Sequence, residues 1–410
     1  MPALDGMRIL DLTQYEAGTS CTQALAWLGA DVVKVERPGS GDPGRAAFEE
    51  YGAEESDYFL NWNSNKKSVT IALDKPEGRA LLLRLVPRFD VLVENFGPGV
   101  VEKLDLDYDA VRQAHPGIIY GRIKGFGASG PYADYKCFDP VALAAGGAFS
   151  VTGEPGGPPM APGPTIGDSG TGVQMALALV AAYVQKLRTG EGQLVEISMQ
   201  EAVTYFMRTM IALGSKRGTR ATPRRGSGMG ALTRLYSCAP GGPNDYVYVM
   251  AITPRMWHSL CAAIERPELE RDPRFESGKL RRENQDALVA EIAAWTASHT
   301  KHEAMRRLAE AGVPASAVLD TLDLHQDPHL VERGFVRTIE HETMGPIRLL
   351  GWPPRLSRSE VAIEAAPLLG RHNEEVLAAE LGLSEAEVTA LRERGVVGAE
   401  GAPARTRSRA

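Results

Sequence analysis

One carboxylate, Asp168, lies in a run of small residues at 165–172, directly before an apolar stretch at 173–185 that has helical periodicity. The glycines in this run let the backbone approach a ligand closely, and the first turn of a helix offers unpaired N–H groups and a positive dipole end. An aspartate in such a turn could act as a nucleophile. Asp168 and Ser169 are also typical N-cap residues, and the segment taken alone favours that structural role. The choice between the two roles depends on the rest of the chain.

Three further segments, at 61–67, 94–99 and 121–127, place polar or charged side chains at turns beside expected strands. In an open α/β sheet, the turns that follow the strands gather along one edge, where ligands bind. Each segment could be ordinary loop sequence. Together with Asp168 they predict a long, partly basic groove with glycines along its rim.

A dinucleotide site is the first alternative for such a groove, because Glu36 ends the second expected strand where a ribose-binding acid would stand. The turn at 13–18 has one glycine where a phosphate-binding turn needs three, which disfavours NAD or FAD. Arg37 is a better indication of a phosphate on an adenosine, because its guanidinium matches phosphate geometry. Its alternative is a solvated surface arginine.

The elements that must position these residues alternate between strands and helices. The pattern predicts strands at 7–12, 32–35, 69–73, 91–94, 117–123 and 194–198, with helices at 19–28, 75–86 and 173–185 between them. Alternation of this kind predicts an α/β fold with a doubly wound, mainly parallel, Rossmann-like sheet that is covered on both faces.

The second half of the chain predicts a smaller α+β domain. Residues 205–230 read as a connection that ends in a mobile glycine loop. A strand at 246–252 and helices at 254–264, 284–297 and 301–311 follow, then a strand pair within 328–355 and helices at 373–381 and 384–393. The expected division is a large domain at 1–200, a linker at 201–225, a small domain at 226–325, a return to the large domain at 326–397, and a disordered tail at 398–410.

Composition narrows the function classes. A chain of 410 residues exceeds the usual size of a single core, so two domains are expected. A net charge of -7 argues against nucleic-acid partners. The four cysteines have no metal-ligand spacing and fit reduced thiols in the cytoplasm. The start of the chain lacks a signal-peptide pattern, and no apolar run is long enough for a membrane anchor.

An ordered series of short motifs carries a resemblance to a known family. The series includes Leu-Gly-Ala-Asp-Val-Val-Lys-Val-Glu at 28–36 and Val-Glu-Asn-Phe-Gly-Pro-Gly at 93–99; its other members lie at 10–18, 65–68, 138–139, 167–169 and 366–372. The chain resembles the family III CoA-transferases over nearly its whole length. This group contains formyl-CoA transferase and carnitine CoA-transferase (CaiB/BaiF), and the likeness is greatest to the formyl-CoA:oxalate CoA-transferases.

The resemblance implies a large domain built from both chain ends, an inserted small domain, and an interlocked homodimer of ring-shaped subunits. It implies coenzyme A as the ligand, carried in by an acyl-CoA donor and passed to a carboxylic acid acceptor, with no metal and no nucleotide cofactor. Asp168 matches the family's nucleophile, with Asp139 and Glu16 beside it in the catalytic site. Positions matching the CoA site are Glu16, Ala17, Arg37, Ile71, Ala72, Leu73, Asp74, Asn95, Phe96, Gly97, Lys103, Lys136, Cys137, Phe138 and Asp139. Gly226, Gly228 and Gly230 match a mobile loop over the active site.

A carboxylate suits this chemistry, because its attack on a thioester gives a mixed anhydride and frees the CoA thiolate. The thiolate can then form an aspartyl-CoA thioester, and an incoming acid reverses the steps. We expect the helix end to keep Asp168 ionised and nearby backbone N–H groups to stabilise oxyanions. Asp139 is expected to orient a reacting group, and its alternative is a structural cap.

Two other functions remain open. Acyl-CoA racemases resemble this chain but have a histidine directly before the aspartate that matches Asp139; Phe138 stands here and cannot shuttle a proton. A non-catalytic acyl-CoA-binding protein would use Asp168 only as a cap.

The sequence departs from the formyl/oxalate pattern at two positions that bear on the substrate. Glu16 replaces a glutamine, and Ala47, followed by Phe48, replaces a bulky aromatic residue. A larger mono- or dicarboxylate, such as succinate or an aromatic acid, fits these changes.

Overall fold

The computed structural model describes residues 1–47 and 55–401. Phe48, and the part of the expected tail at 402–410, lie outside the described residues. The chain divides into two compact units. The first holds Met1–Ser150, Ala161–Thr222 and the chain from Arg333 onward, and the second holds Val151–Met160 and Pro223–Glu332.

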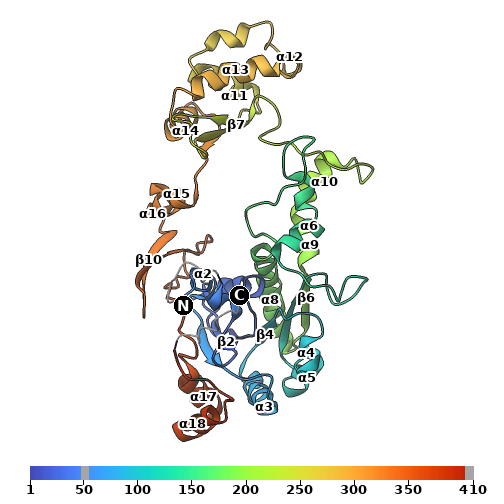
Figure 1. The fold of residues 1–410 in the computed structure, drawn as a ribbon, viewed down its shortest axis with the longest axis vertical. Coiled ribbons are helices and arrows are strands. Elements are labelled where there is room, and N and C mark those ends of the chain that lie inside the picture. Colours follow the sequence, from blue (N-terminus) through green and yellow to red (C-terminus); the bar gives the residue numbers. More distant parts are fainter. Residues whose placement is uncertain (48–54, 402–410) are drawn as a thin grey trace, which may run out of the picture. The chain divides into compact units, whose positions relative to one another are not determined.

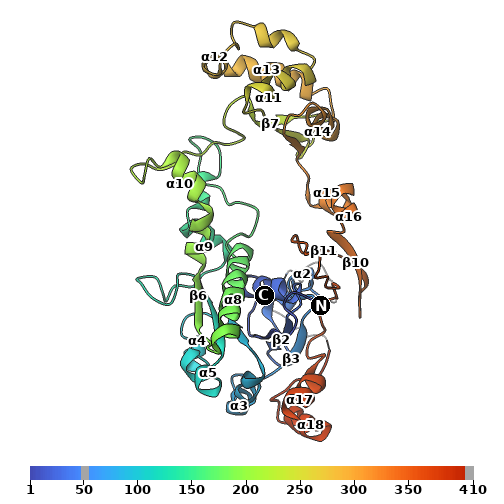
Figure 2. The same cartoon turned by 180° about the vertical axis from the view of Figure 1, so that it is seen from behind.

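A six-stranded parallel sheet forms the centre of the first unit, in the order β3-β2-β1-β4-β5-β6 (Figures 1 and 2). Its strands are β1 (Arg8–Asp11), β2 (Asp31–Glu36), β3 (Lys67–Thr70), β4 (Val91–Glu94), β5 (Ile119–Lys124) and β6 (Leu194–Ser198). The strand order reverses between β1 and β4, which is the position where open α/β sheets bind ligands. The predicted parallel α/β sheet is therefore confirmed.

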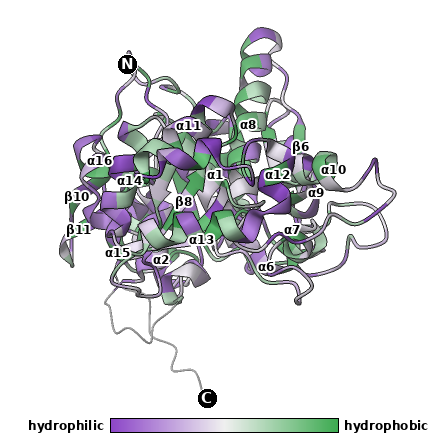
Figure 3. Cartoon of the chain, turned by 90° about the horizontal axis from the view of Figure 1, so that it is seen from above, coloured by the Kyte–Doolittle hydropathy of each residue, from purple (hydrophilic) through white to green (hydrophobic). Residues whose placement is uncertain are grey.

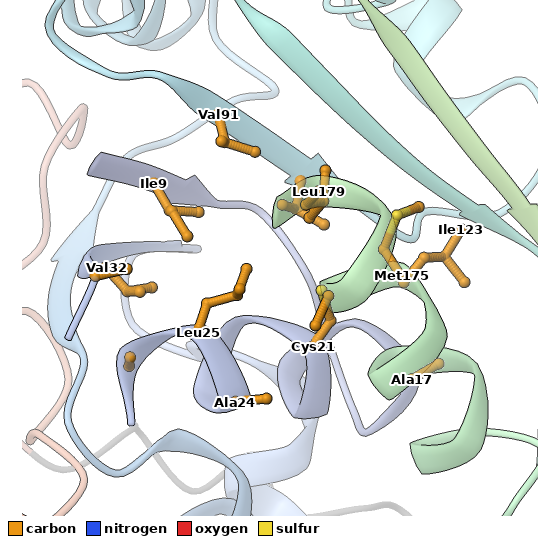
Figure 4. Close-up of a cluster of buried hydrophobic side chains, with 14 of the residues drawn as sticks. Ile9, Ala17, Cys21, Ala24, Leu25, Val32, Val91, Ile123, Met175 and Leu179 are labelled. Atoms are coloured by element: carbon orange, nitrogen blue, oxygen red, sulfur yellow. The ribbon is translucent and has the colours of Figure 1, made fainter. Parts of the chain in front are cut away.

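Both faces of the sheet are buried, because successive strand residues enter different cores. Ile9 belongs to one hydrophobic cluster and Leu10 to another, and both are fully buried. Figure 4 shows the first cluster, in which Ile9, Val32 and Val91 face side chains of two helices. These helices are α1 (Ala17–Ala26) and α8 (Ser169–Thr189). The near-continuous apolar strands agree with a sheet covered on both sides.

The second cluster joins the two ends of the chain. Helices on this face are α3 (Pro76–Leu85), α5 (Tyr108–Ala114), α17 (Asn373–Leu381) and α18 (Glu385–Glu393). Asn373 accepts a hydrogen bond from the Thr70 backbone N–H at 2.7 Å, and Val376 and Leu377 pack with the sheet residues. α17 lies beside β3 and α3 in Figures 1 and 2.

Short helices complete the first unit, together with a hairpin. They are α2 (Asp57–Asn63), α4 (Val100–Lys103), α6 (Asp139–Ala145), α7 (Ala148–Val151), α9 (Met199–Phe206) and α10 (Arg208–Gly214), the last residue of α7 belonging to the second unit. β10 (Val336–His341) and β11 (Gly345–Leu350) form the antiparallel pair expected within 328–355. Within 205–230, the segment interpreted as a connection, the end of α9 and the whole of α10 belong to the first unit, and the second unit continues from Pro223.

The second unit contains an antiparallel sheet and a helical layer. The sheet has the order β7 (Thr233–Ser237), β8 (Tyr246–Met250) and β9 (Ala315–Ala317). The helices are α11 (Pro254–Ala263), α12 (Gly278–Glu283), α13 (Gln285–Thr296), α14 (Lys301–Glu310), α15 (Thr321–Gln326) and α16 (Pro328–Glu332). Helices α11, α13 and α14 match the sequence pattern closely, whereas β7 and β9 are not predicted.

Within residues 1–47 and 55–401, no helix is long and apolar enough to cross a membrane.

Candidate functional site

Three carboxylates stand at the starts of three helices in the first unit. Glu16 directly precedes α1, Asp139 is the first residue of α6, and Asp168 directly precedes α8. Glu16 and Asp139 both act electrostatically on Asp168, and Asp139 also acts on Glu16. The fold thus brings together the three residues that the sequence assigned to the catalytic site.

Close packing of α1 against α8 places two of these helix starts side by side. A Cβ at Gly172 would lie 2.1 Å from the Ser20 Oγ and 2.7 Å from the Ala17 carbonyl oxygen. No side chain fits there, so glycine is required for the two helices to approach. The glycine-rich sequence after Asp168 therefore serves helix packing, and through it the position of Asp168 relative to Glu16.

Asp139 holds the turn that carries Asp168. Its Oδ1 accepts a hydrogen bond from the Asp168 backbone N–H at 3.1 Å, and the Gly167 N–H also bonds to this carboxylate. A Cβ at Gly167 would lie 2.7 Å from the same oxygen, so glycine is required here too. Asp139 is only 8% exposed. Asp139 therefore holds the backbone of the turn at Asp168.

The carboxyl group of Asp168 is not used as a helix cap. Asp168 occupies the N-cap position with φ -87° and ψ -72°, and its side chain makes no capping hydrogen bond. The Ser169 hydroxyl donates backward to the Thr165 carbonyl oxygen at 2.8 Å. The cap interpretation of either residue is wrong, because the helical backbone at Asp168 is not the extended conformation that an N-cap side chain needs. This leaves the Asp168 carboxyl partly buried and without a capping role.

The ionisation expected for Asp168 is also wrong. Burial, followed by the charges of Glu16 and Asp139, raises the pKa of Asp168 to about 8. A helix N-terminus stabilises a charge by about 0.3–1 kcal/mol, which is less than one pKa unit. The helix end is too weak to offset burial beside two other carboxylates. The Asp168 carboxyl therefore holds a proton more tightly than an exposed aspartate does.

Glu16 is buried more deeply than Asp168, at 3% exposure. Burial raises its pKa to about 7, although hydrogen bonds from the Thr165 and Tyr58 hydroxyls lower it. The Thr165 hydroxyl donates to the Glu16 Oε1 at 2.5 Å. Burial also raises the pKa of Asp139. In the described part of the chain, none of the three carboxylates forms a salt bridge.

A pocket lies at the carboxyl ends of β1, β4 and β5, where the strand order reverses, and Asp168 is part of its wall. Its empty volume is about 860 Å³, including the space at its mouth. Asn95 bridges the two central strand ends, because its side-chain amide donates to the Gln14 carbonyl and its oxygen accepts from the Gln14 N–H, both at 2.8 Å. Residues expected from the sequence that line this pocket are Ala17, Asn95, Phe96, Gly97, Lys136, Cys137, Phe138 and Asp168.

The remaining expected residues lie elsewhere. Arg37 follows β2 and Asp74 follows β3; they pair at 3.6 Å, and both are well exposed. Ile71 and Ala72 are buried, and Leu73 packs against the second cluster. Lys103 is an exposed residue at the end of α4. These positions follow β2, β3 and β4, so they share the carboxyl edge of the sheet without lining the pocket.

The glycine loop belongs to the second unit. The Gly226 N–H bonds to the Gly153 carbonyl at 3.1 Å, and Gly228 pairs with Arg234 as an isolated bridge. Gly230 has φ +129°, a conformation that favours glycine, at the turn before β7.

The sequence predictions give no individual role to several residues around the site. Thr165 and Tyr58 both bond to Glu16, and Tyr15 adopts φ +58° directly before it. Lys124 lines the pocket and binds the Glu94 Oε2 at 2.9 Å and the Phe96 carbonyl at 2.7 Å. Thr165 could have been found, because it opens the glycine-rich run. No sequence signal marks Tyr58, which lies in an unpredicted helix.

The structure also argues against the dinucleotide alternative. Glu36 is 4% exposed, and its carboxylate binds Arg45 at 2.7 Å and the Ser68 hydroxyl at 2.6 Å. A glutamate engaged in this way cannot bind a ribose. Across the two described ranges, no group of three or more His, Cys, Asp or Glu side chains is arranged to hold a metal ion.

Comparisons with known proteins identify the family of this chain. The model of a family described as CoA-transferase family III matches residues 4–373. A formyl-CoA:oxalate CoA-transferase of Streptomyces coelicolor is 41% identical, over 96% of this chain and 99% of its own. One of Rhodopseudomonas palustris is 39% identical, over 96% and 97%.

Solved structures give the same family. A CaiB/BaiF family protein from Brucella suis has a TM-score of 0.83 and 29% identity, covering 92% of this chain and 99% of its own. The protein Rv3272 of Mycobacterium tuberculosis has a TM-score of 0.77 and 29% identity, covering 91% and 98%. The chain therefore belongs to CoA-transferase family III and is an enzyme of that class.

Proposed function

We propose that this enzyme moves CoA from an acyl-CoA thioester to a free carboxylic acid, with Asp168 as the nucleophile. The observation that supports this most directly is the state of the Asp168 carboxyl: it reaches the pocket, makes no cap and has no salt bridge within the described residues. Family membership supplies the acyl-CoA donor and the acid acceptor as substrates. A carboxylate nucleophile preserves the energy of the thioester in each intermediate.

The reaction takes four displacements. An Asp168 oxygen attacks the thioester carbonyl carbon, the C–S bond breaks, and a mixed anhydride and CoA thiolate result. The thiolate attacks the Asp168 carbonyl carbon, the anhydride C–O bond breaks, and the donor acid leaves an aspartyl-CoA thioester. The acceptor carboxylate attacks this thioester and releases the thiolate. The thiolate then attacks the acceptor's acyl carbon, giving the new acyl-CoA and free Asp168.

The pocket residues suit the thiol arm of CoA. Phe96 and Phe138 offer apolar surface, and Asn95 and Gly97 offer polar backbone groups at the strand ends. Arg37 and Lys103 are exposed cations on the same edge of the sheet, and we assign them to the phosphates of CoA. Gly226, Gly228 and Gly230 are proposed as a loop that covers the reacting groups.

Covalent trapping tests the nucleophile. After incubation with acyl-CoA, hydroxylamine or borohydride should modify Asp168, as read by peptide mass spectrometry. Asp168→Asn should give no adduct, whereas Asp5→Asn, which changes an exposed carboxylate before β1, should react like the wild type. Binding of CoA without any adduct would identify the chain as a non-catalytic acyl-CoA-binding protein instead.

The racemase alternative lacks its proton carrier. Phe138 stands beside Asp139, is 57% exposed, and meets the Tyr15 ring edge-on at 5.7 Å. The phenyl ring of Phe138 cannot shuttle a proton. Exchange of the α-hydrogen of a branched acyl-CoA for deuterium, without CoA transfer to any acid, would reverse this choice.

Two positions of the chain, Glu16 and Ala47, bear on the choice of acid acceptor. The relatives named above are formyl-CoA:oxalate CoA-transferases, but Glu16 and Ala47 replace the glutamine and the bulky aromatic residue of that pattern. We propose a larger mono- or dicarboxylate, such as succinate or an aromatic acid. A matrix of acyl-CoA donors against acids, read by mass spectrometry of the CoA esters, should show transfer beyond oxalate. Transfer to oxalate alone would contradict this.

A homodimer is also proposed, on the basis of an apolar stripe along α8. The stripe has coiled-coil spacing, and Leu177 and Leu187 are 72% and 69% exposed. Its members are Val173, Leu177, Val180, Val184 and Leu187. Figure 3 shows α8 largely in the colour of hydrophobic residues. Light scattering should give twice the chain mass, and Leu177→Glu should lower it.

A further inference from the structure

We propose that Glu16 works in its protonated form, as a hydrogen-bond donor to the reacting carboxyl group of Asp168, so that the two residues hold one proton between them in the active enzyme. This inference rests on the proposed role of Asp168 as nucleophile. It assigns Glu16 a role in the reaction that differs from that of an anionic base.

The surroundings of Glu16 favour a neutral carboxyl group. The side chain is 3% exposed, and its hydrogen-bond partners are the uncharged hydroxyls of Thr165 and Tyr58. Hydroxyl donors favour the ionised form, but burial is the larger influence on the pKa of Glu16, and a buried carboxylate normally needs a cation to offset it. Within the two described ranges no cation forms a salt bridge with Glu16, Asp139 or Asp168.

The negative charge of the acceptor carboxylate also favours a neutral Glu16. The acceptor enters as a carboxylate and must reach the carbonyl carbon of Asp168, beside Glu16 and Asp139. Of the cations that line the pocket, Lys124 is bound to Glu94, and Lys136 is exposed to solvent. Two further negative charges next to the entering anion would repel it strongly in a partly buried site. A proton on Glu16 removes one of them.

The titratable groups that face Glu16 and Asp168 come from every element around these two residues. They are Asp139 of α6, Tyr58 of α2, Tyr15 of the turn before α1, and Cys137 before α6. Burial raises the pKa of Cys137 to about 11, and burial with the neighbouring acids raises that of Tyr58. Both groups remain neutral donors near pH 7, so the ionisable protons of this site belong to the carboxyl groups.

A donor at Glu16 has a specific use in the mechanism. When the thiolate or the acceptor attacks acylated Asp168, negative charge develops on the former carbonyl oxygen of Asp168. The Glu16 O–H can donate a hydrogen bond to this oxygen. The proton stays on Glu16 throughout, so this step exchanges no proton with solvent. Losing one donor of this kind costs roughly 10²–10³ in kcat.

The pH dependence of kcat in three variants tests the proposal. The wild type should show a bell, because the doubly protonated pair lacks a nucleophile and the doubly ionised pair lacks the donor. Glu16→Gln keeps an N–H donor that cannot ionise, so kcat at the optimum should stay within about threefold of the wild type. Its alkaline limb should disappear. Its acid limb should stay near the wild-type position, because residue 16 is uncharged on that limb in both enzymes.

Two further variants complete the test. Glu16→Ala removes the donor, and its kcat should fall roughly 10²–10³-fold while thermal unfolding shows an intact fold. Glu191→Gln changes an exposed glutamate beyond the far end of α8 and should keep the wild-type bell. An inactive Glu16→Gln enzyme, or one that retains the alkaline limb, would overturn the proposal. The Asp168 adduct is measured in the same samples, so a missing adduct in the wild type would instead count against the proposed function.

Discussion

Two groups of buried carboxylates lie at the same edge of the sheet, and their ionisation is opposite. In the first, Glu16 and Asp168 have pKa values raised to about 7 and about 8. In the second, Asp11 and Glu36 have pKa values lowered to about 2. Burial pushes the pKa upward in both groups and is the largest influence on each residue. The difference therefore comes from the partners of the carboxylates.

The second group is compensated by cations that are themselves buried. Lys66 binds Asp11 at 3.0 Å, and Arg45 binds Glu36 at 2.7 Å. Lys34, fully buried, binds Asp42 at 2.8 Å and the Thr13 carbonyl at 2.7 Å. This paired group holds the turn before Glu16, because the Asp42 Oδ1 also accepts a hydrogen bond from the Tyr15 N–H at 3.0 Å. Paired carboxylates thus fix the backbone, and the unpaired carboxylates beside them remain available for chemistry.

The largest expected effect comes from changing Asp168, the proposed nucleophile in the unpaired group. Asp168→Asn retains the shape of the side chain but replaces the nucleophilic oxygen with an amide, so kcat for CoA transfer should fall by roughly 10⁴-fold or more. Steady-state kinetics with an acyl-CoA and an acid acceptor measures this. CoA binding by calorimetry should change little. Residual transfer above about one part in a hundred would show that another group carries the acyl intermediate.

Breaking the paired group should change stability instead. Asp11→Asn leaves the buried ammonium groups of Lys66 and Lys34 without their shared carboxylate, which should cost about 3–5 kcal/mol in the free energy of unfolding. Denaturant unfolding monitored by fluorescence gives this value. The double variant Asp11→Asn/Lys66→Met is the matched control, and it should recover part of the loss because one uncompensated charge is removed. A loss below about 1 kcal/mol for Asp11→Asn would mean that the pair is hydrated.

The sequence predicts the strands that carry these carboxylates better than it predicts how the carboxylates ionise. Strands β4 and β6 match their predicted bounds, because apolar runs flanked by turns mark buried parallel strands clearly. β3 ends at Thr70, three residues before its predicted end. The Ala72 N–H instead bonds to the Val396 carbonyl at 2.8 Å. A contact with a segment more than 300 residues away leaves no local signal.

Within the site, the motifs identify Asp168, Asp139 and Glu16, but not how they ionise. A sequence shows that Asp168 precedes a helix, and this favours an ionised carboxylate. It does not show that α1 and α8 pack closely enough to bring Glu16 near, nor that Tyr58 and Thr165 supply only neutral hydroxyls. The pKa of each carboxyl is set by the sum of these tertiary contacts.

The smallest expected effect is the pH dependence of stability, which should separate the two groups. Asp11 and Glu36 have lowered pKa values in the folded state, so their stabilising contribution is present above their ordinary values of 3.8 and 4.5 and is lost as the pH falls toward 2. Glu16 and Asp168 have raised values, so between about pH 4 and pH 8 the folded state binds more protons than the unfolded chain. Raising the pH through this window therefore favours unfolding.

Thermal unfolding at pH 5 and pH 8 measures the second contribution. The wild type should melt at a lower temperature at pH 8, and the decrease should be smaller in the double variant Glu16→Gln/Asp168→Asn, because amides do not release protons. An unpaired carboxyl whose pKa rises on folding weakens the fold as it ionises, whereas a paired one strengthens it. An equal decrease in the wild type and the double variant would mean that these two carboxyls titrate alike in the folded and unfolded states, and the contrast between the two groups would then have to come from elsewhere.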